Sequence, residues 1–140
     1  MGRGASGRDT TGNYQRATLA TQAEHADVVR RLEDQSYPSG TYDTQTLRPV
    51  EYDSGYQVTF CQIGDDYSRG EYAGRVNEFL RYSSDGRTLA GKFEGTPEIS
   101  FHVANRATAI RLAKKYNQIS VWDWQNCDEI NTGGTGRRRR

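Results

Sequence analysis

The sequence predicts an α+β domain in which a four-stranded antiparallel sheet carries two helices on one face. Between about residues 52 and 126, segments whose apolar residues alternate with a period of two are separated by segments with the helical period of 3.6. The order of these segments is strand, helix, strand, strand, helix, strand. This is the βαββαβ order of ferredoxin-like domains.

Composition divides the chain of 140 residues into four parts. Residues 1–21 are rich in Gly, Ser, Thr and Arg and show no hydrophobic period, which predicts a flexible arm. Residues 22–51 are predicted to contain a short helix and a connecting loop. The α+β domain spans residues 52–126, and residues 127–140 are predicted to form a Gly/Arg tail whose glycine-rich part is a linker.

The first half of the domain follows from the spacing of its apolar residues. Gly55 to Ile63 alternates Tyr, Val and Phe with Gln, Thr and Cys, which is the pattern of a half-buried strand. Apolar residues then recur at helical spacing from Tyr72 to Leu80, and the turn residues Ser83 to Gly86 end this helix. Arg87 to Phe93 is predicted to be a short second strand.

The second half repeats this alternation. Pro97 to Val103 is predicted to be the third strand, because its apolar residues occupy every second position. Asn105 is placed to cap a helix that ends near Tyr116. Asn117 to Trp124 is predicted to be the last strand.

Polar residues at a spacing of two mark the predicted functional surface. On the third and the last predicted strands, each polar set lies on one face of the sheet. In a ferredoxin-like sheet the first strand lies between these two, so the sets form one row across it. The predicted binding residues are Glu98, Ser100, His102, Gln118, Ser120, Trp122, Trp124 and Tyr56.

Two interpretations of this row stay open. In the first, Glu98, Ser100, Gln118 and Ser120 form a hydrogen-bonded network that holds the last two strands and the turn before the final strand in place. In the second, the same residues contact a partner. Double-mutant cycles separate the two, because members of one network have non-additive effects on stability.

The histidine content argues against an enzyme. Only His25 and His102 are present, and a hydrolase triad needs Ser, His and an acid in contact. Ser100 and His102 share a predicted strand face, but residues two apart on a strand lie roughly 7 Å apart, too far for a nucleophile and its base. The acidic clusters lack the spacing of a calcium loop or a zinc site, so no metal and no cofactor are predicted.

The charge distribution favours a protein partner over a nucleic acid. Nineteen basic residues, less the four C-terminal arginines, leave 15 basic against 18 acidic residues, so the body carries no basic excess. Nucleic-acid binding is the alternative, with bases stacked on the sheet aromatics Tyr56, Phe60 and Phe101. The tail would then contact phosphates through Arg137, Arg138, Arg139 and Arg140.

Cysteine usage and hydropathy bear on the compartment. Cys61 and Cys127 lie far apart and form no CxxC pair, so neither a zinc site nor a disulfide scaffold is indicated. No apolar run approaches the roughly 20 residues of a membrane helix, and residues 1–21 lack the apolar core of a signal peptide. We therefore expect a cytoplasmic protein without a membrane contact.

The order of parts after residue 97 resembles that of a group of small proteins. Glu98-Ile99-Ser100-Phe101, the Ala-rich helix from Ala107 to Ala113, and Gln118-Ile119-Ser120 resemble a pattern of an E-x-S strand, a helix and a Q-x-S strand in small uncharacterised proteins of bacteria, phages and plasmids. The resemblance covers about 30 residues and implies no enzyme activity. It implies an accessory protein of a mobile element, such as an inhibitor of host defence, acting in the host cytoplasm.

Overall fold

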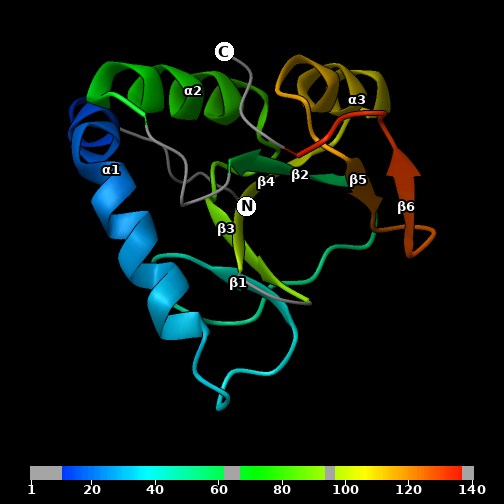
Figure 1. The fold of residues 1–140 in the computed structure, drawn as a ribbon, viewed down its shortest axis with the longest axis horizontal. Helices are drawn as coiled ribbons and strands as arrows, with labels where there is room; N and C mark the ends of the chain where they lie inside the picture. Colours follow the sequence, from blue (N-terminus) through cyan, green and yellow to red (C-terminus); the bar gives the residue numbers. More distant parts are fainter. Residues whose placement is uncertain (1–10, 62–66, 94–96, 137–140) are drawn as a thin grey trace.

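The computed structural model describes residues 11–61, 67–93 and 97–136, and for residues 11–21 and Cys61 only the backbone. Within these residues it contains three helices and six strands (Figure 1). In chain order they are α1 (Thr11–Leu32), β1 (Gly40–Asp43), β2 (Tyr56–Cys61), α2 (Arg69–Tyr82), β3 (Leu89–Lys92), β4 (Glu98–Val103), α3 (Arg106–Lys115), β5 (Ser120–Asp123) and β6 (Asp128–Asn131).

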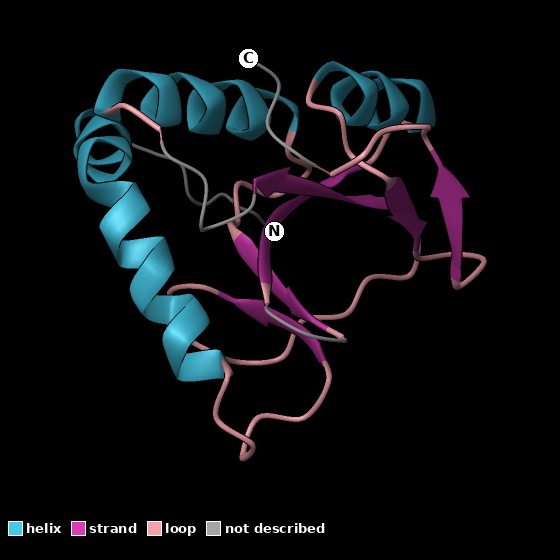
Figure 2. Ribbon diagram, in the orientation of Figure 1, coloured by secondary structure: helices cyan, strands magenta, loops and turns pink. Residues whose placement is uncertain are grey.

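The strands form one antiparallel sheet in the order β1-β3-β4-β2-β5-β6. Helices α2 and α3 lie over one face of it, and α1 runs along the side next to α2 and β3 (Figure 2). The predicted sheet of four strands with two helices is therefore wrong. The missed strands β1 and β6 have four residues each, too few and too polar to show an alternating pattern.

The predicted division of the chain also differs from the structure. The predicted end of the arm at residue 21 falls inside α1, which begins at Thr11. The segment predicted as a helix and a loop contains β1, and the predicted tail contains β6. Arg137 to Arg140 lie outside the described residues.

Local sequence signals set the start of two helices. Ser68 caps α2 through a capping box, because its hydroxyl accepts the Glu71 amide at 3.1 Å while the Glu71 carboxylate accepts the Ser68 amide at 3.1 Å. Asn105 caps α3 by accepting the Thr108 amide at 2.9 Å. Both caps satisfy amides that the first helical turn leaves without a partner.

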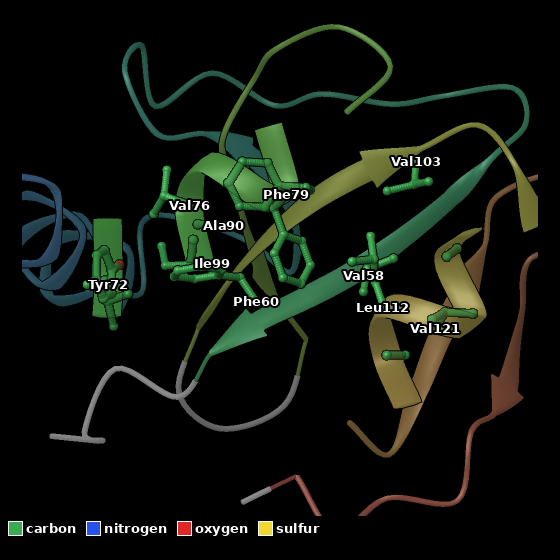
Figure 3. Packing of buried hydrophobic residues seen from close by; sticks show 14 of the residues in the cluster. Val58, Phe60, Tyr72, Val76, Phe79, Ala90, Ile99, Val103, Leu112 and Val121 are labelled. Atoms are coloured by element: carbon green, nitrogen blue, oxygen red, sulfur yellow. The ribbon is translucent and has the colours of Figure 1, made fainter. Parts of the chain in front are cut away.

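The hydrophobic core lies between α2, α3 and the sheet (Figure 3). Val58 and Phe60 of β2 point to the same side as Phe101 of β4, and all three are fully buried. The Phe60 ring meets the Phe79 and Phe101 rings edge to face, at centroid distances of 5.4 and 5.8 Å. The sheet aromatics proposed for base stacking therefore belong to the core, which corrects that prediction for Phe60 and Phe101.

Helix α1 is fastened at two points. Buried His25 lies with Nδ1 2.6 Å from the Tyr72 hydroxyl of α2, and burial lowers the pKa of His25 to about 4. Beyond the helix end, Lys92 Nζ donates to the Asp34 and Tyr37 carbonyls at 2.9 and 2.7 Å. Among the described residues, no helix combines the length and the apolar composition that a bilayer span requires.

Candidate functional site

The second face of the sheet, turned away from α2 and α3, carries polar side chains. Residues directly opposite each other in an antiparallel pair share a face, and Gln57 lies opposite both His102 and Trp122. Thr59 lies opposite Ser100 in the same way. We call this surface the polar face, and it includes Thr41, Asp43, Gln57, Thr59, Leu89, Gly91, Phe93, Glu98, Ser100, His102, Ser120 and Trp122.

A buried hydrogen-bonded chain shows that the polar face is concave. Gln57 Nε2 donates to Ser100 Oγ at 2.7 Å, and Gln57 Oε1 accepts from Thr41 Oγ1 at 3.1 Å. Strands β2 and β1 are three strand spacings apart in the sheet order, about 14 Å if the sheet were flat. Two side chains this short span that separation only because the sheet curls toward the polar face.

Gly91 on β3 leaves room for this chain. A Cβ atom at Gly91 would lie 3.1 Å from Gln57 Nε2 and 3.3 Å from the Phe93 ring. Glu98 lies directly opposite Gly91 on β4, and such pairs have Cβ positions about 5 Å apart. The Gln57 amide, the Phe93 ring and Glu98 therefore surround one glycine.

One part of the polar face is covered. The Tyr52 ring stacks on the His102 ring at a centroid distance of 3.7 Å with 11° between the planes, and Trp124 meets Tyr52 edge to face at 5.5 Å. His102 is only 5% exposed, and burial lowers its pKa. We call His102, together with Tyr52, Ser84 and Trp124 around it, the covered part.

Both ring nitrogens of His102 are engaged. Nε2 lies 2.7 Å from the Ser54 carbonyl oxygen, which only accepts, so Nε2 carries the proton and donates. The Ser84 hydroxyl, 2.5 Å from Nδ1, then donates to the ring. This contact resembles a nucleophile and its base. An acyl-transfer site would also need free backbone amides to stabilise an oxyanion. The two nearby amides are already engaged, since Ser84 N–H donates to the His102 carbonyl and Asp85 N–H donates to Ser83 Oγ. The cluster closes the turn after α2.

The other part of the polar face is partly exposed in the described part of the chain. Phe93 is 56% exposed, and its ring lies 6.3 Å from the Trp122 ring with 33° between the planes. The Glu98 carboxylate accepts from Thr59 Oγ1 at 3.4 Å, and partial burial raises its pKa in spite of this bond. We call Thr59, Phe93, Glu98 and Trp122 the uncovered part.

The structure separates the predicted row of binding residues into groups. Glu98, Ser100, His102, Ser120 and Trp122 lie on the polar face, as their alternation with core residues requires. Tyr56 lies on the opposite face, because it alternates with Gln57 and shares its side with Val58. Trp124 follows β5 and packs in the covered part, where its buried Nε1 has no hydrogen-bond partner among the described residues.

Gln118 belongs to a different cluster from Glu98. Its Nε2 donates to the Tyr116 carbonyl at 3.0 Å, and its own carbonyl accepts from Thr132 Oγ1 at 2.7 Å and from the Gly134 amide at 3.1 Å. The bonds of Glu98 with Thr59 and of Ser100 with Gln57 lie within the polar face instead. The predicted single network therefore consists of two networks.

The glycine-rich run near the C-terminus is not a linker. A Cβ atom at Gly134 would overlap the backbone of Asn117 and Gln118, so only glycine allows this close approach. The Gly136 amide donates to the Asn117 carbonyl at 2.7 Å, and the Thr135 amide donates to Asn117 Oδ1 at 3.2 Å. These residues fasten the chain to the turn before β5.

Sequence reasoning missed several residues of the polar face, among them Gln57, Phe93 and Thr41. Gln57 was visible as a polar position of the first predicted strand but was not connected with Ser100. Phe93 ends a short predicted strand, and an apolar residue next to a turn is a signal that could have identified it. Thr41 lies on a strand that the sequence did not predict.

Among known proteins, no family model, curated sequence or solved structure matches this chain.

Proposed function

We propose that the protein binds another protein through the uncovered part of its polar face and does not turn over a substrate. The observation that carries this proposal is the Phe93–Trp122 ring pair, with Phe93 56% exposed, beside the half-buried Glu98. Aromatic residues around a desolvated polar group are the usual composition of protein interaction hot spots. A concave sheet places these groups where a partner side chain can reach several of them together.

The energetics of Glu98 support a functional role. Burial raises the pKa of Glu98, so ionisation of this group at neutral pH opposes folding. An ionisable group with a pKa shifted by burial is a frequent property of functional sites. Thr59 and Ser100, which flank it on the same face, give it a polar setting.

Nucleic-acid binding, the alternative, has less support. Phe60 and Phe101 are fully buried in the core, so they offer no stacking surface. Glu98 and, on β6 opposite Trp122, the exposed Glu129 bring negative charge to the polar face, which disfavours phosphates. A filter-binding series would test it, because affinity carried by the arginine tail falls with added salt and the slope decreases when the tail is deleted.

The compartment and the biological origin stay predictions. We propose that the contact is made in the cytoplasm, in agreement with the absence of a bilayer-spanning helix among the described residues. The E-x-S and Q-x-S pattern leads us to propose a mobile-element accessory protein, such as an inhibitor of host defence. Its partner would then be a host protein.

Photo-crosslinking tests the proposed function. A benzophenone amino acid is placed at Phe93, and in a matched chain at Ile119, which is 55% exposed and precedes β5 on the side of the core residue Val121. We expect a covalent protein adduct in cells from position 93 and a much weaker one from position 119. Equal adducts from the two positions, or adducts with nucleic acid alone, would contradict the proposal.

A further inference from the structure

We infer that the outer surface of α2 and α3 binds the phosphate backbone of a nucleic-acid duplex. This second contact goes beyond the proposed function and does not depend on it, because the two helices cover the face of the sheet opposite to the polar face (Figure 2). Together the two helices contain seven basic residues and only two acidic ones. We call Arg81, Arg111 and Lys114, which are all exposed, the basic helix face.

The basic residues are concentrated on these helices although the rest of the body is acidic. Without the four C-terminal arginines the chain has 15 basic and 18 acidic residues. Removing the seven basic and two acidic residues of α2 and α3 leaves eight basic against sixteen acidic residues. Such a separation of charge orients a polyanion toward one side of a protein. The carboxylates that disfavour phosphates on the polar face lie on the other side of the sheet.

Contacts between the two helices bring the basic helix face together. The Arg111 guanidinium lies 5.2 Å from the centre of the Tyr82 ring, and Tyr82 follows Arg81 at the end of α2. Lys114 lies three residues after Arg111, so the two side chains share one side of α3. The apolar residues of α3 are buried on its other side, which turns Arg111 and Lys114 toward solvent.

The acidic residues of the two helices do not neutralise these cations. Within the described part of the chain, Arg81, Arg111 and Lys114 form no ion pair. The Glu71 carboxylate accepts the Ser68 amide at the start of α2. Glu78 bonds to Lys115 Nζ at 2.7 Å and to the Tyr116 hydroxyl. The basic helix face therefore keeps its charge for an outside anion.

The composition of this surface favours a duplex over a protein or a membrane. The large apolar side chains that are exposed in the described residues are Phe93 and Ile119, and neither lies on α2 or α3. Protein interfaces and membrane-bound helices use apolar or aromatic side chains, whereas phosphate contacts need only charge. Arg111 already lies over the Tyr82 ring, so an unpaired base would have to displace it to stack there.

The arginine run at the C-terminus begins beside the same surface. The Gly136 amide donates at 2.7 Å to the carbonyl of Asn117, two residues beyond the end of α3. Arg137 to Arg140 follow Gly136 directly in the sequence, and four residues reach at most about 14 Å. The chain therefore attaches four further cations near the C-terminal end of α3.

Fluorescence anisotropy with a short labelled DNA duplex of mixed sequence tests the inference on the full chain. Arg111→Gln and Lys114→Gln are combined in one variant, and Arg31→Gln with Arg48→Gln, which removes the same charge from exposed positions outside the two helices, is the matched control. We expect the first variant to lose about tenfold in affinity at low salt and about two units of salt slope, and the control to change less than about twofold. Equal losses in the two variants would overturn the inference, because net charge alone would explain them.

Three further measurements assign the site. Thermal unfolding verifies that both variants are folded. Duplex added to the ¹⁵N-labelled parent should shift amides of α2 and α3 and leave those around Phe93 in place, and shifts confined to the polar face would overturn the inference. Deletion of residues 137–140 should weaken binding without abolishing it, so complete loss on deletion would assign the contact to the tail and overturn the inference as well.

Vesicles of phosphatidylserine and phosphatidylcholine provide the competing surface. We expect the duplex to bind and the vesicles to bind much more weakly, since the outer sides of α2 and α3 have no large apolar side chain to insert among the described residues. Binding to vesicles but not to the duplex would overturn the inference. The crosslink from position 93 is measured on the opposite side of the sheet, so the proposed function and this inference can fail separately.

Discussion

His102 and Glu98 stand on the same face of the same strand, β4, and differ in what lies over them. Tyr52 stacks on His102, and the turn after α2 supplies Ser84 to its ring. Glu98 accepts from Thr59 and lies opposite Gly91, next to the exposed Phe93 ring. A single alternating pattern therefore contributes a structural residue in the covered part and a candidate binding residue in the uncovered part. The difference arises from loops, not from the strand.

The largest expected effect comes from filling the covered part. Gly55 has a φ of +85°, and a Cβ atom there would overlap the His102 ring, which Tyr52 and Ser84 hold in place. We expect Gly55→Ala to lower the free energy of unfolding by about 2–4 kcal/mol, measured by urea denaturation. Gly133 is the matched control, with a φ of +83° and open space around its Cβ position. A loss of about 1 kcal/mol is expected there from backbone strain alone. Equal losses of stability at the two glycines would show that the His102 ring shifts at little cost in free energy.

A pair of aromatic truncations compares the two parts directly. Tyr52→Ala removes the ring that stacks on His102 and the hydroxyl that donates to Asp85 at 2.8 Å, so we expect a loss of about 2–3 kcal/mol. Phe93→Ala removes a ring that is 56% exposed, and the expected loss is below about 1 kcal/mol. If Phe93 proved as important as Tyr52 for stability, the uncovered part would be structural as well.

The two parts should respond to pH in opposite directions. The lowered pKa of His102 means that the unfolded chain binds more protons, so the covered part loses stability as pH falls below about 6.5. The raised pKa of Glu98 means that the folded chain binds more protons, so the uncovered part loses stability as pH rises through and above about 4.5.

Glu98→Gln isolates the second effect. We expect the variant to be more stable than the parent at pH 7 and to lose this advantage near pH 4, as followed by thermal unfolding at both pH values. Buried His25, whose pKa is about 4, adds to the acid destabilisation, so NMR titration of each imidazole is needed to assign that effect. A variant less stable than the parent at pH 7 would contradict the assignment of Glu98.

The smallest expected effect lies between the two parts. Gly91→Ala would press on Gln57 and on the Phe93 ring by a few tenths of an ångström. We expect a stability change within about 1 kcal/mol and a measurable shift of the Phe93 and Trp122 ring signals. Unchanged ring signals would mean that Phe93 moves independently of the sheet.

The spacing of apolar residues located two helices and four strands between residues 56 and 123, because each of them buries one face. It missed β1 and β6, since strands of four polar-rich residues are stabilised by pairing and not by their own pattern. The same limit applies to the site. Alternation identified Glu98 and Ser100 as neighbours on one face, but the parity that relates β2 to β4 depends on register, so Tyr56 was placed on the wrong side.

The cover over His102 had no local signal at all. Tyr52 lies in a loop, and nothing in its own sequence neighbourhood specifies a ring in the adjacent sheet. Gly55 was predicted as the start of a strand, whereas its positive φ and close approach to His102 are tertiary requirements. Residues that decide whether a polar strand face is buried therefore come from segments whose composition shows only that they are loops.

Lys92 and Phe93 are consecutive residues with attachments on opposite sides of the sheet. Lys92 ties β3 to the carbonyls beyond α1, while the next residue forms the rim of the uncovered part. The end of β3 therefore links the segment after α1, through Lys92, to the exposed side of the polar face, through Phe93. If a partner displaces the Phe93 ring, the backbone of β3 moves with it and the hydrogen bonds of Lys92 change. We then expect the amide hydrogens near the end of α1 to exchange at an altered rate.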